Sequence, residues 1–136
     1  MSPVTIDTPG LLALLSKYFD SLYLNEVLEM GYPLEKLLQE TDLPIGANFE
    51  VFKVSDGYHS TEIEAAVEIL FYQNIIPVNK SNRDHINLKP LREERESFLD
   101  FYKEVLSQDG IKEPSEFIAK LEEILEEIVD KFIKIK

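Results

Sequence analysis

The sequence predicts an α+β fold that is predominantly α-helical. Apolar residues recur three and four positions apart in several stretches, most regularly over residues 61–73 and 118–135, and this spacing is typical of amphipathic helices. Short runs at 49–54, 75–78 and 85–88 contain β-branched or aromatic residues and are typical of strands. With 136 residues, 44% of them hydrophobic, and no cysteine, the chain can form a buried core without disulfides.

The N-terminal part is divided by its prolines. Residues 1–9 are predicted to be a flexible lead-in, because two prolines oppose regular structure there. Thr8 is suited to cap the following helix, with Pro9 in its first turn. We assign residues 10–110 to one helical domain and residues 111–136 to a C-terminal amphipathic helix that packs on the domain or on a partner.

Two short helices are predicted next. The first covers residues 22–30 and ends at Gly31, since glycine is common just beyond a helix C-terminus. The second begins at Pro33 and ends before Pro44, because the residue that precedes a proline avoids helical geometry.

The middle of the chain is predicted to be a helix followed by a β-hairpin. Asp56-Gly57 marks a turn before the helix. The motif Thr61-Glu62-Ile63-Glu64 fits a capping box at the helix start, and Asn74 suits the left-handed conformation common at a helix end. Residues 75–78 and 85–88 are the expected hairpin strands, joined by a polar turn.

Two further helices are predicted after Pro90, one ending at Gly110 and one starting at Pro114. The last helix has the spacing of a coiled-coil seam and a wider apolar stripe than one seam requires. Such a helix packs across its own domain or contacts a partner chain, and the sequence leaves both readings open. If it contacts a partner, the expected binding residues are Phe117, Leu121, Ile124, Leu125, Ile128, Phe132 and Ile135.

This order of elements resembles a winged-helix domain. The resemblance is carried by Glu62–Phe71 as the recognition helix, Asn74-Ile75-Ile76 as its exit and Val78–Leu88 as the wing. It implies a winged-helix-like core with a small β-hairpin and two C-terminal helices similar to the dimerising helices of small winged-helix regulators. The recognition helix departs from the pattern, since it carries glutamates and neither lysine nor arginine. Residues 11–19 and 24–31 resemble the helical effector-associated adaptor domains of bacterial conflict systems.

The net charge of −12 bears on the choice of partner. None of the stretches 1–58, 59–90 and 91–136 is basic. Nucleic-acid affinity comes largely from lysine and arginine contacts to phosphates, so we do not expect a nucleic-acid partner. An anionic membrane surface is disfavoured for the same reason. In a DNA-binding alternative, the residues expected to contact phosphates are Lys80, Arg83 and Lys89.

No catalytic or metal site is expected. His59 and Glu62 stand three residues apart, but a catalytic zinc needs three protein ligands. The five glycines form no phosphate-binding loop. We therefore expect no enzymatic activity, no cofactor and no metal. No apolar run approaches the ~20 residues of a membrane helix. Without cysteines the compartment is little constrained, and the cytoplasm is the default expectation.

These observations predict a non-enzymatic protein–protein interaction or adaptor module. Its partner is expected to be another protein or a second copy of the chain, contacted through the C-terminal helix. The alternative is a winged-helix DNA-binding transcriptional regulator that acts as a dimer.

Overall fold

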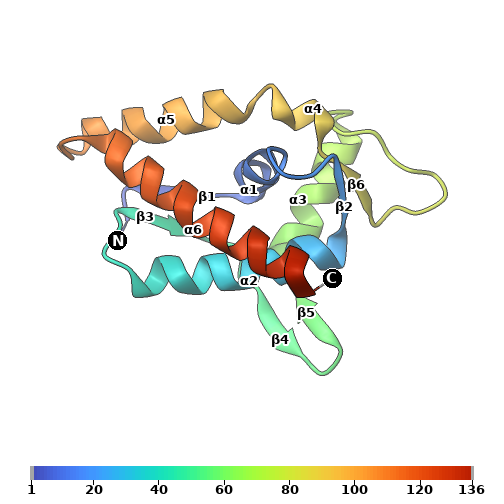
Figure 1. The fold of residues 1–136 in the computed structure, drawn as a ribbon. Coiled ribbons are helices and arrows are strands. Elements are labelled where there is room, and N and C mark those ends of the chain that lie inside the picture. The colour runs from blue at the N-terminus through green and yellow to red at the C-terminus, as the bar shows by residue number, and fades with distance from the viewer. Residues whose placement is uncertain (1, 136) are drawn as a thin grey trace.

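The computed structural model describes residues 2–135 and has the predicted α+β character, with helices predominating (Figure 1). The helices are α1 (Thr8–Leu15), α2 (Leu24–Glu40), α3 (Thr61–Tyr72), α4 (Lys89–Arg92), α5 (Arg95–Gln108) and α6 (Pro114–Ile135). The strands are β1 (Val4–Ile6), β2 (Ser21–Tyr23), β3 (Ile45–Ala47), β4 (Phe52–Val54), β5 (Gly57–His59) and β6 (His85–Asn87).

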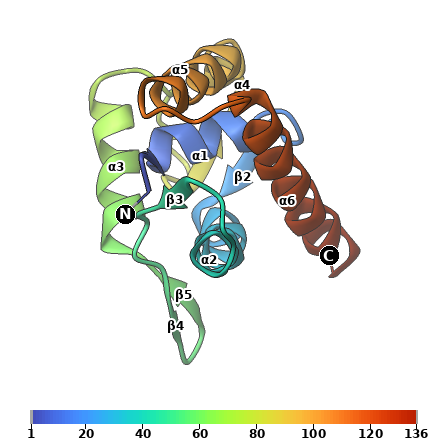
Figure 2. The same ribbon diagram turned by 90° about the vertical axis from the view of Figure 1, so that its left-hand side faces the viewer.

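Helix α1 is the centre of the core. Figure 2 shows it surrounded by α2, α3, α5 and α6, and the four leucines of α1 are buried completely. A helix that is apolar on all sides is stable only when it is enclosed in this way. Its N-terminal cap is Asp7 rather than the predicted Thr8, because Asp7 Oδ1 accepts the Gly10 N–H at 3.0 Å.

The strands form three short ladders instead of one sheet. In the described part of the chain, β1 pairs with β3 in parallel, and β2–β6 and β4–β5 are antiparallel pairs. The first two ladders join segments that are far apart in the sequence. The β4–β5 hairpin projects from the body below α2 and α3 (Figure 1), around the turn predicted at Asp56-Gly57, where Gly57 has φ 137°.

The N-terminal lead-in is more ordered than predicted. Residues 4–6 form β1 beside β3, and Val4 and Ile6 are buried while Thr5 between them is exposed. The alternation places two β-branched side chains in the core. The prediction of a flexible segment over residues 1–9 is therefore wrong for this strand.

The two short helices predicted around Gly31 and Pro33 are one continuous helix, α2. Gly31 does not end the helix: it lies inside α2 and is buried beside Leu11, Ile63 and Phe49. The helix also buries an apolar face on both sides of the proline. This packing outweighs the helix-breaking tendency of Pro33, which local sequence reasoning overestimated.

The predicted wing is also wrong. Strand β6 pairs with β2, with Leu22 opposite Ile86, and residues 75–78 form no strand. Both Leu22 and Ile86 are buried, so this pairing adds to the core. The winged-helix resemblance thus lacks its hairpin, and it stays a prediction in other respects.

The ends of the middle and C-terminal helices follow the sequence more closely. Helix α3 ends at Tyr72, and Gln73 is its C-cap. Asn74 follows and adopts the expected left-handed conformation at φ 60°. Its N-cap is Ser60, whose hydroxyl accepts the Ile63 N–H, so the predicted capping box at Thr61 is not formed. Gly110 follows α5 at φ 82°, and α6 begins at Pro114 as predicted.

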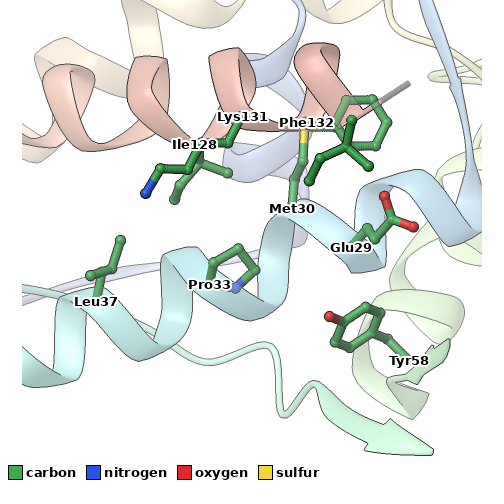
Figure 3. A pocket seen from close by; sticks show the side chains of 9 residues that line it. Glu29, Met30, Pro33, Leu37, Tyr58, Ile128, Lys131 and Phe132 are labelled. Carbon is green, nitrogen blue, oxygen red and sulfur yellow. The ribbon is translucent and has the colours of Figure 1, made fainter. Parts of the chain in front are cut away.

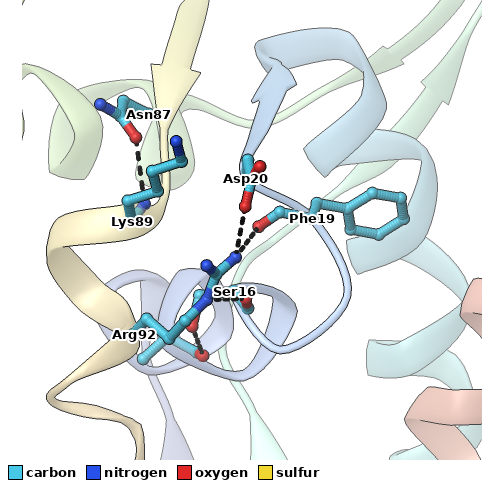
Figure 4. A network of polar contacts seen from close by, with 7 residues as sticks. Ser16, Phe19, Asp20, Asn87, Lys89 and Arg92 are labelled. Carbon is cyan, nitrogen blue, oxygen red and sulfur yellow. Dashed lines mark hydrogen bonds and ion pairs between the residues drawn. The ribbon is translucent and has the colours of Figure 1, made fainter.

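Arg92 ties the β2–β6 region to the end of α1. Its Nε donates to the Ser16 carbonyl at 2.7 Å, and its Nη2 donates to the Phe19 carbonyl at 3.1 Å and to Asp20 Oδ1 at 2.8 Å (Figure 4). The hydrogen bond from Arg92 and the nearby charge of Lys89 hold the pKa of Asp20 below its ordinary value of 3.8.

Candidate functional site

The apolar stripe of α6 faces the protein's own core. Helix α6 packs against α2 and α5, and Leu121 and Leu125 are buried there. Leu121 and Leu125 therefore stabilise the fold and line no groove within residues 2–135. Of the other five predicted residues, Ile128 and Phe132 are also buried, but all five border one of two hollows.

At the C-terminal end of α6, three of these residues border an apolar groove. We call it the α2–α6 groove; its volume is about 540 Å³ (Figure 3). Its lining residues are Glu29, Met30, Pro33, Leu37, Tyr58, Ile128, Lys131, Phe132 and Ile135. Helix α2 supplies one wall and α6 the other, and Tyr58 reaches in from β5.

The floor of the α2–α6 groove is fixed by packing. Met30, Ile128 and Phe132 are buried, and the Phe132 ring meets Phe19 edge-on with centroids 6.0 Å apart. At the open end Ile135 is 83% exposed. The groove is therefore preformed, and its end is open to solvent.

Two charged side chains, Glu29 and Lys131, line this mostly apolar groove. Glu29 comes from α2 and Lys131 from α6, and Lys131 Nζ is 4.0 Å from Glu127 Oε1 on the same helix. Both signs of charge are thus present at one groove. Tyr58 packs on Tyr32, with ring centroids 5.0 Å apart, which holds its ring beside the groove.

Phe117 and Ile124 border a separate hollow near the start of α6. They are half-buried and lie with Leu43 and Thr41 in a space of about 450 Å³. The seven predicted residues therefore form no single patch. The structure divides them into two core leucines, this hollow and the α2–α6 groove.

A second apolar groove was not predicted from the sequence. We call it the α3–α5 groove; its volume is about 580 Å³, and it is lined by Pro9, Ala66, Ile69, Leu70, Gln73, Ile75, Pro90, Leu91, Glu94 and Phe98. A signal for it exists in α3, where Ile69 is an apolar position outside the stripe expected to face the core. Its side chain is exposed and lines this groove.

Two of the three cations of the DNA-binding alternative, Arg83 and Lys89, lie near carboxylates. Arg83 Nη2 is 2.7 Å from Glu68 Oε2, and the Arg83 guanidinium lies 5.6 Å from the Phe71 ring centroid. Lys89 lies close enough to Asp20 to lower its pKa. Lys80 is exposed in the loop after α3. Helix α3 also exposes Glu62 and Glu68, so the alternative gains no support and stays a prediction.

The buried acid Glu35 has a structural explanation. Its carboxylate accepts three consecutive backbone N–H groups, from Phe49 at 2.6 Å, Glu50 at 3.0 Å and Val51 at 3.1 Å. The left-handed conformation of Glu50, at φ 50°, is of the kind that turns successive N–H groups toward one anion. A carboxylate held in this way anchors the loop before β4.

Residues 2–135 contain no group of three or more side chains placed to hold a metal ion. Within the same residues no helix combines the length and the apolar character needed to cross a bilayer. Comparison of the chain with protein-family models, with curated proteins and with solved structures found no match.

Proposed function

We propose that this protein is a non-enzymatic protein–protein interaction module that binds a helical segment of a partner in the α2–α6 groove. The observation that carries the proposal is the groove itself, with buried Met30 and Phe132 as its floor and exposed Ile135 at its open end. A partner helix with an apolar stripe would cover this floor and bury Ile135, which is the usual mode of helix recognition in a groove.

A second copy of the chain is the second candidate occupant. One observation favours it: Glu29 and Lys131 carry opposite charges at one groove, and a self-complementary contact between two copies requires both signs of charge on one surface. The net charge of −12 opposes it, because two copies repel each other. We therefore place a different protein first.

The test compares two isoleucines of α6. Ile135 lines the groove, whereas Ile133 is 53% exposed on the same helix and does not line it. The probe is a fluorescent amphipathic peptide with a leucine stripe and both lysine and glutamate on its polar face. Ile135→Ser is expected to weaken binding by roughly fivefold or more, and Ile133→Ser is the matched control.

Light scattering over a wide concentration range separates the two occupants. A monomer that binds the peptide supports a different protein as the partner. A dimer that Ile135→Ser dissociates and Ile133→Ser preserves supports self-association. A monomer whose weak peptide binding is the same in both variants contradicts the proposed groove.

A further inference from the structure

We infer that the α3–α5 groove is a second docking surface, which takes a cationic amphipathic helix from another protein. The inference goes beyond the α2–α6 groove and does not depend on it, because the two grooves share no lining residue. If both are used, the protein bridges two partners.

This groove has exposed apolar side chains and adjoins a smaller hollow on α5. Ile69 and Ile75 are 55% and 43% exposed on the α3 side. On the α5 side, Phe98 and Glu94 border both this groove and a smaller hollow that includes Phe101, which is 58% exposed. Large exposed apolar side chains gathered in this way mark binding surfaces.

The groove is preformed by the way α3 ends. Asn74 turns the chain through the left-handed conformation, and the Leu70 carbonyl then accepts the N–H groups of Ile75 at 3.0 Å and Ile76 at 3.4 Å. Leu70 and Leu91 are buried beneath the groove. The position of Ile75 is therefore set by backbone hydrogen bonds, and little ordering is required when a ligand binds.

Electrostatics select the partner. Glu94 is the only charged side chain among the lining residues of this groove. The arginines of neighbouring segments are engaged elsewhere: Arg83 pairs with Glu68, Arg92 with Asp20, and Arg95 with Glu96 and Glu122. The groove is therefore apolar with one carboxylate, and it belongs to a strongly acidic protein. This charge distribution favours a ligand that carries lysine or arginine beside its apolar stripe.

The same charges disfavour a second copy as the occupant. A symmetric contact through this groove would place two Glu94 carboxylates on one interface, between chains that each carry a charge of −12. A helix is preferred because side chains spaced three and four residues apart can reach both the α3 and the α5 wall.

The experiment is an isoleucine-methyl NMR titration of the full chain with a synthetic leucine–lysine peptide that has leucines at helical spacing. A leucine–glutamate peptide of the same spacing is the charge control. Saturable shifts of the Ile69 and Ile75 methyls with the lysine peptide alone are expected. The Ile128 and Ile135 methyls report the α2–α6 groove separately, so the two proposals succeed or fail independently.

Three variants establish the site. Phe101→Ser is expected to weaken the binding seen at Ile69 by roughly fivefold or more, and Glu94→Gln by roughly two- to fivefold. Ile133→Ser is the matched control on α6 and should leave the peptide binding observed at Ile69 unchanged. All three side chains are accessible to solvent, and thermal melts verify that each variant folds.

Several outcomes would overturn the inference. Unmoved Ile69 and Ile75 methyls exclude the groove as a site for this ligand. Equal weakening by Phe101→Ser and Ile133→Ser shows non-specific attraction to an acidic protein. A dimer in light scattering that Phe101→Ser dissociates shows that the occupant is a second copy.

Discussion

The carboxylate of Glu35 on α2 accepts the backbone N–H of Phe49 at 2.6 Å, and both residues are buried. The same carboxylate accepts the next two N–H groups along the chain. One side chain thus holds the loop that leads to the β4–β5 hairpin, which carries Tyr58 to the α2–α6 groove.

Glu35→Ala is expected to destabilise the protein by about 2–4 kcal/mol, because three backbone donors lose a charged acceptor and two of the three residues are buried. Urea unfolding measures the change. Glu40→Ala, at an exposed position of the same helix, is the control and should change stability by less than about 0.5 kcal/mol. Similar losses in both variants would contradict the anchoring role.

The sequence predicted correctly those features that neighbouring residues determine, such as the buried side of a helix and the place where it ends. The three-four spacing of α3, α5 and α6 fixes which sides of these helices are buried, and Asn74 and Gly110 adopt the left-handed conformations expected beyond helix ends. These features depend on neighbouring residues alone.

The sequence did not predict features that depend on contacts between residues far apart in the chain. Pro33 lies within a helix because both halves of α2 reach the core, and Ile86 pairs with Leu22 from a distant part of the sequence. The interaction between Glu35 and Phe49 has no local pattern. Ile128, Phe132 and Ile135 were named from the sequence as possible partner contacts, but neither the α2–α6 groove nor its α2 wall was predicted. The α3–α5 groove was not predicted either, because it depends on which sides of two helices stay uncovered.

Gly10 and Tyr102 are expected to be energetically coupled. A Cβ on Gly10 would overlap the Tyr102 hydroxyl oxygen, and that hydroxyl is buried without a hydrogen-bond partner among residues 2–135. Gly10→Ala should therefore cost about 1–3 kcal/mol. In a Tyr102→Phe background the cost should fall by at least about 1 kcal/mol, as measured by a double-mutant cycle in urea. Additive effects would contradict this close contact.

The Asp20–Arg92 contact is expected to strengthen with pH. Because Arg92 and Lys89 lower the folded-state pKa of Asp20 below its ordinary value of 3.8, its contribution is present above that value and is lost as the pH falls through the folded-state pKa. Urea unfolding of the wild type and Asp20→Asn should differ most at neutral pH and converge in acid. A difference independent of pH would rule out the ion pair as its source.

Removal of α6 is expected to unfold the protein. The helix contributes six buried apolar side chains, whose burial stabilises by on the order of 10 kcal/mol, comparable with the whole stability of a typical domain. A chain ending at Gly110 should show no cooperative thermal transition by circular dichroism. A cooperative transition in that chain would instead show that α6 is an appendage of an independent domain.

The most direct test of the proposed function is an isoleucine-methyl NMR titration with the mixed-charge amphipathic peptide, observed at Ile128 and Ile135. The account predicts saturable shifts of both methyls, weakened by Lys131→Glu or Ile135→Ser and unchanged by Ile133→Ser. Unmoved methyls, in a protein that light scattering shows to be monomeric at the same concentrations, would contradict it.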